Sequence, residues 1–95
     1  MNVDVAKSVY KDAEKYPKYI RDLVDEQIEI LEKAEKLSDV SNVFKMQWTT
    51  EPYYRLKFGT YRFIMYYDLS VNTIEVLSLT HRKDTYKKQN LPWHR

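Results

Sequence analysis

The 95-residue sequence is long enough for one domain with one hydrophobic core and too short for two. Hydrophobic residues make up 43% of the chain and aromatic residues 15%, which excludes a disordered protein. The net charge is only +2, but residues 1–42 hold ten acidic and seven basic residues, whereas residues 43–95 hold four acidic and nine basic ones. A basic half of this kind predicts an anionic partner.

The chain has no cysteine, which excludes disulfide bonds and thiolate metal sites and favours a cytoplasmic protein. Its longest apolar run, Phe63–Tyr67, is far too short to cross a bilayer, so we expect no membrane association. Asp4 interrupts the first apolar patch, which argues against a signal peptide. With two histidines and no carboxylate cluster at ligand spacing, we expect no metal site and no cofactor.

The first half of the chain predicts a short strand and then two helices. Residues 1–6 alternate apolar and polar side chains, as a strand does. Ser8 suits the N-cap of a helix that runs to Tyr16, and Pro17 suits the first turn of a second helix over Lys18–Leu37. The apolar side chains of the second helix keep helical spacing, which predicts that one face is buried. They are Ile20, Leu23, Val24, Ile28, Leu31 and Ala34.

The second half is rich in β-branched and aromatic residues and predicts four strands. They cover Val43–Trp48, Tyr53–Phe58, Tyr61–Tyr67 and Thr73–Leu79. Two helices followed by antiparallel strands make an α+β fold, in which a helical hairpin covers one face of a small, mainly antiparallel sheet. We expect a single domain over residues 1–95, of which residues 88–95 form a C-terminal tail.

The chain's single glycine, Gly59, predicts a two-residue type II′ turn together with Thr60. In that register Lys57 faces Arg62, and Arg55 lies on the same sheet face because side chains alternate. Like charges opposite each other cost a few tenths to about 1 kcal/mol. The pattern leaves two interpretations open, a solvated sheet face and a preformed anion site. The opposite face, under the helices, carries Tyr54, Leu56, Phe58, Tyr61 and Phe63.

The stretch LTHRKDTYKK ends the last predicted strand in positive charge. We expect it to bring His81, Arg82 and Tyr86 to the same sheet face as the hairpin cations. Guanidinium groups bind phosphate and aromatic rings stack on exposed bases, which is how single-stranded RNA is usually held. The other cations of the stretch, which suit RNA backbone or simply a soluble tail, are Lys83, Lys87 and Lys88.

Three motifs, taken in order, resemble the RelE/ParE superfamily of toxins from type II toxin–antitoxin modules. They are the strand YRLK, the turn GTYR and the ending HRKDTY, and the earlier segment KSVYKDAEKYPKYIRDLVDEQI resembles the family's helical hairpin. The resemblance covers roughly residues 1–87. It implies a toxin held inactive by a cognate antitoxin. In the RelE branch it implies a ribosome-dependent endoribonuclease that cuts mRNA.

The same resemblance assigns site residues. Arg55 and Lys57 match the strand cations of the RelE branch, Arg62 matches the arginine after the turn, and Arg82 and Tyr86 match its C-terminal pair. His81 stands where other members often carry His or Lys. The ParE branch, which acts on DNA gyrase, generally lacks the complete set, so the retained pair favours RelE. A gyrase inhibitor and a catalytically degenerate binding module remain the alternatives.

Metal-free RNA cleavage by the RNA's own 2′-hydroxyl needs a base, cations around the phosphate and an acid for the leaving oxygen. Lys57 suits the base or an electrostatic clamp, and Arg82 suits a clamp because a guanidinium group hardly gives up its proton. Tyr86 suits stacking on a base or orienting it. His81 suits an acid or a base because imidazole titrates near neutrality, although an ordinary loop histidine is the simpler interpretation.

Overall fold

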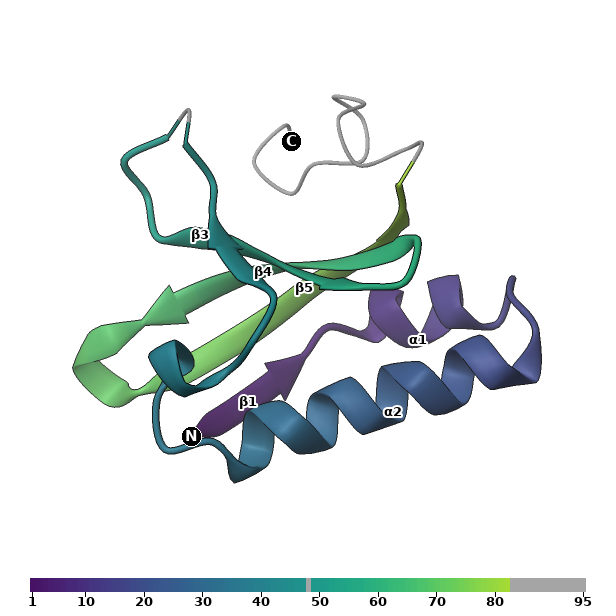
Figure 1. Cartoon of the computed structure of the whole chain (residues 1–95), viewed down its shortest axis with the longest axis horizontal. Coiled ribbons are helices and arrows are strands. Elements are labelled where there is room, and N and C mark those ends of the chain that lie inside the picture. Colours follow the sequence, from purple (N-terminus) through teal and green to yellow (C-terminus); the bar gives the residue numbers. More distant parts are fainter. Residues whose placement is uncertain (48, 83–95) are drawn as a thin grey trace.

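The computed structural model describes residues 1–47 and 49–82. Two helices cover one face of a five-stranded sheet (Figure 1). The main elements are β1 (Asn2–Val5), α1 (Lys7–Ala13), α2 (Lys18–Lys33), β2 (Val43–Lys45), β3 (Tyr53–Phe58), β4 (Tyr61–Asp68) and β5 (Thr73–His81). Two short 3-10 helices, η1 (Leu37–Asp39) and η2 (Leu69–Val71), lie in the connections. The predicted α+β fold is confirmed.

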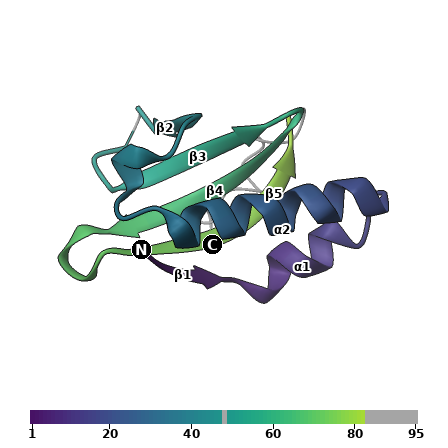
Figure 2. The same cartoon turned by 60° about the horizontal axis from the view of Figure 1, so that its bottom comes forward.

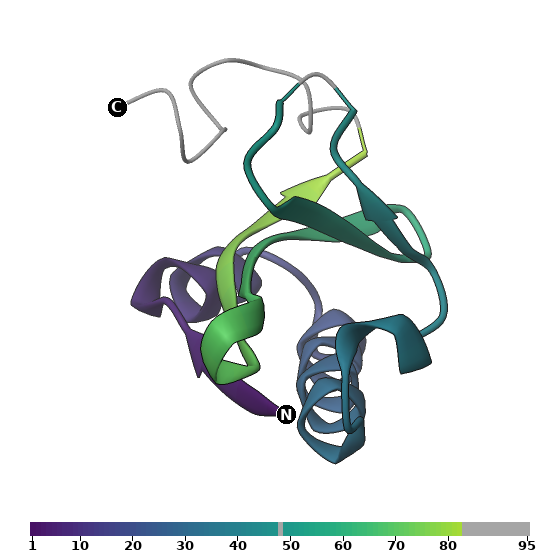
Figure 3. The ribbon, with the colours of Figure 1, turned by 90° about the vertical axis from the view of Figure 1, so that its left-hand side faces the viewer.

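The strands lie in the order β1-β5-β4-β3-β2 (Figure 2). Strands β2 to β5 pair antiparallel, whereas β1 pairs parallel to β5. The chain therefore starts at one edge of the sheet, crosses its face through α1 and α2, and enters β2 at the other edge. Among residues 1–47 and 49–82, no helix covers the second face of the sheet, and we call that face the open face (Figure 3).

The main core lies between the helices and the sheet. Val9 of α1, Leu31 of α2 and Phe63 of β4 are fully buried in it, each with 0% of its surface exposed. Burying one such side chain stabilises a fold by roughly 1.5–3 kcal/mol. The five residues predicted under the helices all belong to this core or pack against it, which confirms the predicted alternation along β3 and β4.

Helix α1 begins two residues earlier than predicted and ends three residues earlier. The backbone of Ala6 stands at its N-cap, without a side-chain hydrogen bond. The predicted cap at Ser8 is wrong, because the Ser8 hydroxyl donates to the Leu77 carbonyl of β5, 3.2 Å away. Tyr16 lies beyond the helix, and its ring meets that of Tyr61 edge-on at 4.8 Å between centroids. Contacts with the sheet therefore decide both ends.

Helix α2 ends at Lys33, four residues before the predicted end at Leu37. Ala34 is already extended, and the side-chain amide of Asn72 donates to the Glu35 carbonyl at 2.7 Å. Leu37 then turns into η1 and is buried in the core. Neither α2 nor any other helix in the described ranges is long and apolar enough to span a membrane.

Strand β2 covers only Val43–Lys45, although the sequence predicts a strand to residue 48. Its ladder with β3 closes at the bond from the Met46 N–H to the Tyr53 carbonyl, 2.9 Å long. The Tyr53 N–H instead donates to the Glu51 carbonyl at 2.8 Å, and Pro52 has no N–H. Strand β3 thus offers no further donor to β2.

Candidate functional site

The β3–β4 hairpin fixes the geometry of the open face. Gly59 has a φ of +65°, whereas Thr60 is not among the residues with positive φ, and this is the pattern of a type II′ turn. The register is the predicted one, with Phe58 opposite Tyr61 and Lys57 opposite Arg62. A Cβ atom at Gly59 would meet no other atom within 4 Å, so the backbone conformation, and not lack of space, requires glycine.

Arg55, Lys57 and Arg62 lie together on the open face, as the alternation predicts, and we call this group the cationic end. Lys57 pairs across the sheet with Arg62, and Arg62 pairs with Thr80 of β5. The next row along the strands holds Arg55, Ile64 and Ser78. Because β3 and β5 are both hydrogen-bonded to β4, the positions of the three cations are set by the sheet.

Arg62 is the most buried member of the cationic end, with 7% of its surface exposed. Its Nε and Nη1 are buried, and no hydrogen-bond acceptor reaches them from the part of the chain that the structure describes. A buried guanidinium nitrogen without an acceptor is costly, since its N–H has lost its hydrogen bond to water and has no other in its place. A bound anion would supply the missing acceptor.

Phe44 of β2 completes the cationic end, and the sequence does not reveal this. It stands opposite Arg55 in the register. The Arg55 guanidinium carbon lies 5.7 Å from the centre of the Phe44 ring, and the Lys57 ammonium lies 5.2 Å from it. Both distances are within the range of cation–π attraction. Alternation along β2 shows which residues share a face with Phe44. It does not show that Phe44 stands opposite Arg55, because the loop between β2 and β3 has no turn motif that would fix the register.

The other end of the open face is acidic. The rings of Tyr53 and Tyr66 meet edge-on there at 5.3 Å between centroids, and Glu75 stands opposite Tyr66. Burial raises the pKa of the Tyr66 phenol, and the charges of Glu51 and Asp68 raise it further. We call Glu51, Asp68 and Glu75 the acidic end. An anion on the open face is therefore attracted to the hairpin end and repelled from the opposite one.

His81 does not join the cations, so its expected place on the open face is wrong. It pairs with Tyr61, whose side chain lies on the helix-covered face, and the two rings meet edge-on at 5.3 Å between centroids. Arg82 follows β5 and is exposed, and its N–H donates to the Thr60 carbonyl at 2.6 Å. The structure thus places Arg82 beside the β3–β4 turn, next to the cationic end.

No protein-family model matches the sequence, and no curated protein matches it. Solved structures do match. The RelE–RelB complex of the archaeon Pyrococcus horikoshii matches at 28% identity and a TM-score of 0.69, over 85% of this chain and 93% of that one. The RelB–RelE complex of Methanococcus jannaschii matches at 27% identity and a TM-score of 0.71, over 88% of this chain and 95% of that one.

The Mycobacterium tuberculosis RelBE2 complex matches at 21% identity and a TM-score of 0.69, over 85% of this chain and 96% of that one, and at that identity it bears on the fold alone. The chain has the RelE-like toxin fold. The resemblance read from the sequence motifs is therefore confirmed.

Four residues predicted for the RelE-like site lie outside the described residues. They are Lys83, Tyr86, Lys87 and Lys88. Their roles stay predictions, as do those of the cations on the open face. Among residues 1–47 and 49–82, no group of three or more His, Asp or Glu side chains is placed to hold a metal ion.

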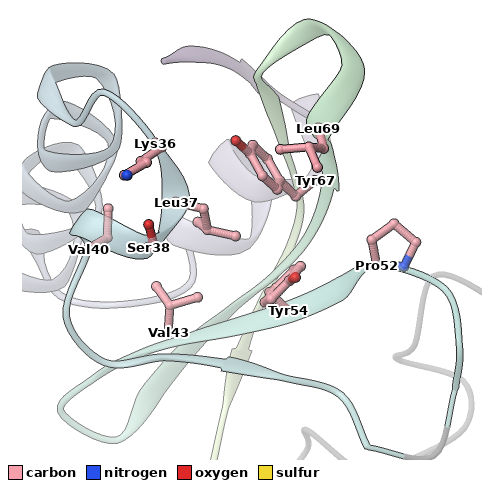
Figure 4. Close-up of a pocket in the computed structure, with 9 residues that line it drawn as sticks. All are labelled: Lys36, Leu37, Ser38, Val40, Val43, Pro52, Tyr54, Tyr67 and Leu69. Atoms are coloured by element: carbon pink, nitrogen blue, oxygen red, sulfur yellow. The ribbon is translucent and has the colours of Figure 1, made fainter.

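A pocket lies on the helix-covered face, on the other side of the sheet from the cationic end. It is a mainly apolar pocket of about 480 Å³ between η1, the start of β2, β3 and the β4–η2 corner (Figure 4). Tyr54 and Tyr67 form its floor, and Leu37 and Leu69 lie at its sides. The Tyr67 hydroxyl donates to the side-chain oxygen of Asn72 at 2.5 Å. Lys36 and Ser38 are the other polar residues of the pocket lining.

Proposed function

We propose that this protein is the toxin of a type II toxin–antitoxin module and acts as a ribosome-dependent endoribonuclease on mRNA. The observation that carries the proposal is the cationic end, where Nε and Nη1 of Arg62 are buried without an acceptor among the described residues. The RelE-like fold, and the similarity to chains from the archaeal RelE–RelB complexes, support the toxin role. Phosphate oxygens of RNA are the acceptors that the cationic end would take.

The proposed reaction uses the substrate's own nucleophile and needs no metal ion. The 2′-oxygen of one nucleotide forms a bond to the adjacent phosphorus, and the bond from phosphorus to the 5′-oxygen breaks. The 2′-hydroxyl proton goes to a base, and the 5′-oxygen receives a proton from an acid. The products are a 2′,3′-cyclic phosphate and a 5′-hydroxyl end.

We assign each residue of the cationic end a role in this reaction according to its position. Arg55 and Arg62 bind the non-bridging phosphate oxygens, on which negative charge builds in the transition state. Lys57 lies between them on the same face and acts as base or as a further clamp. Arg82, beside the turn, closes the site from the edge of the sheet. Tyr86 stacks on the base next to the cut.

Of the predicted residues, His81 takes another role, and the three C-terminal lysines keep theirs. His81 acts on this chemistry only if its ring leaves Tyr61, so we assign it a supporting position at the end of β5. Lys83, Lys87 and Lys88 bind RNA backbone. The proposed site is cytoplasmic, where ribosomes are.

A cognate antitoxin is the proposed protein partner. A basic sheet face that must be kept inactive suits a segment with acidic side chains and apolar anchors. We expect that segment to cover or distort the region between Lys57 and Arg82. Co-expression with the product of the adjacent reading frame should yield a tight complex. Separate purification of the two products would argue against a toxin–antitoxin role.

The decisive test is cleavage of mRNA on purified ribosomes, compared with cleavage of the same mRNA alone. We expect cuts within the coding sequence that need the ribosome. In Arg82→Ala, single-turnover cleavage should fall by about 10²–10³-fold, because a charge-assisted contact made mainly in the transition state is lost, while binding to mRNA-loaded ribosomes weakens much less. Growth arrest with gyrase-trapped DNA breaks and intact mRNA would instead support the gyrase alternative.

A further inference from the structure

We infer that Phe44 is a positioning residue, whose ring holds Arg55 and Lys57 as a ready pair before any anion binds. The inference rests on the proposed function for its catalytic consequence, but the contact itself is independent of that function. Neither the sequence motifs nor the fold assigns Phe44 a role.

The position of Phe44 is unusual for an apolar ring. It is 44% exposed on β2, an edge strand of the sheet, and therefore adds little to the core. Instead its face meets two cations from the neighbouring strand, 5.7 Å away for Arg55 and 5.2 Å for Lys57. The adjacent cation, Lys45, turns elsewhere, and its ammonium donates to the Thr49 carbonyl at 3.3 Å.

The Phe44 ring offsets part of the repulsion between the like charges of the cationic end. Lys57 stands opposite Arg62 and two residues from Arg55, so repulsion alone would drive its ammonium into solvent. The negative face of an aromatic ring attracts both cations at once and does not neutralise them as an acid would. Their full charge therefore remains available to a phosphate, and the side chains do not have to be gathered during the reaction.

The contact can be tested by stability alone. In a double-mutant cycle of Phe44→Leu and Lys57→Met, we expect the unfolding equilibrium constants to show a coupling of about 2- to 5-fold, the size of an exposed cation–π contact. The matched control is Tyr19→Leu with Lys57→Met, since Tyr19 is an exposed aromatic residue of α2. Its coupling should be absent. A Phe44 cycle with no more coupling than the control would overturn the inference, whether or not the protein cuts RNA.

The catalytic consequence is tested by graded substitutions. In Phe44→Leu we expect single-turnover cleavage on the ribosome to fall by about 10-fold. Phe44→Tyr keeps the ring and should stay within about 2-fold of the wild type. Binding to mRNA-loaded ribosomes should change by less than the rate in both variants. Equal losses in the two variants, or full activity in Phe44→Leu, would overturn the positioning role.

The two failures can be told apart. If the wild type never cuts ribosome-bound mRNA, the proposed function fails, and the stability cycle alone decides whether the ring holds the cations. If the wild type cuts and the cycle shows no coupling, the function stands and the role of Phe44 is wrong.

Discussion

The two faces of the sheet are built from the same strands and obey opposite rules. On the helix-covered face, Leu56 of β3 and Phe63 of β4 are opposite each other and almost wholly buried in the core. One residue nearer the Gly59 turn on each strand, Lys57 and Arg62 are opposite each other on the open face. The first pair stabilises the fold, and the second costs free energy. Stability is thus concentrated on one face, and we propose that the other serves to bind an anion.

The open face is itself divided. The cationic end lies beside the Gly59 turn, and the acidic end lies around Tyr66. An RNA strand that followed β3 along its length would pass from attraction into repulsion. We therefore expect the RNA to cross the strands at the hairpin end, from β2 toward β5.

The largest effect should come from the helix-covered face. Phe63→Ala removes a fully buried ring, with 0% exposure, and should lower the free energy of unfolding by about 3–5 kcal/mol. Urea unfolding followed by circular dichroism measures this change. A loss below about 1 kcal/mol would mean that the core does not lie where the two faces divide.

Lys57→Met on the open face should show the reverse behaviour. We expect ribosome-dependent cleavage to fall by about 10²–10³-fold, while the free energy of unfolding stays unchanged or rises, since one of two opposed like charges is gone. Single-turnover cleavage and urea unfolding of the same preparation measure both quantities. Inactivity that merely accompanies a loss of folding would assign Lys57 to structure.

At Gly59, in the turn that sets the register of β3 and β4, the stability of the protein should depend on the backbone conformation that the residue adopts and not on the size of its side chain. Gly59→Ala should destabilise the protein by about 1–2 kcal/mol because alanine resists the positive φ of 65°, although the added methyl group meets nothing. Gly59→Asn should cost less, since asparagine adopts positive φ more readily. Thermal unfolding of the pair measures the difference. Equal stability of all three proteins would contradict the type II′ turn.

The smallest effect concerns the acidic end. Because the pKa of Tyr66 is raised, the unfolded chain ionises first, so this tyrosine contributes stability below about pH 10 that is lost as the pH rises through its folded pKa. NMR titration of ring carbons should find one late-ionising tyrosine that is missing in Tyr66→Phe. In Glu51→Gln its pKa should fall toward the ordinary value. An unchanged pKa there would remove Glu51 from the acidic end.

Features that depend on residues close together in the sequence were predicted correctly. The spacing in α2 located its buried face, and the lone glycine set the pairing of Lys57 with Arg62, because a two-residue turn leaves one register. Strand β5 was harder. It is joined to β4 through η2, and the pairing of β4 with β5 shifts by a residue between Ile64 and Met65 of β4. The face of the sheet on which His81 lies could therefore not be predicted from the sequence.

Contacts between distant residues account for the other differences. Ser8 looks like a cap in its own segment, but its hydroxyl binds a carbonyl 69 residues away. The end of α2 depends on Asn72, 37 residues from the Glu35 carbonyl that it holds. Phe44 reaches the cationic end for a similar reason, since only the assembled sheet brings it beside Arg55. None of these pairings can be predicted from the residues next to them in the sequence.

The central claim, that the open face gives up stability in order to bind an anion, is tested most directly with Arg62→Met. Thermal unfolding of the wild type and this variant should be followed with increasing pyrophosphate at constant ionic strength. Without the anion we expect the variant to be the more stable protein, because the buried guanidinium group is gone. With pyrophosphate the melting temperature of the wild type should rise and that of the variant should not. A variant that is less stable than the wild type, together with equal responses to the anion, would contradict the account.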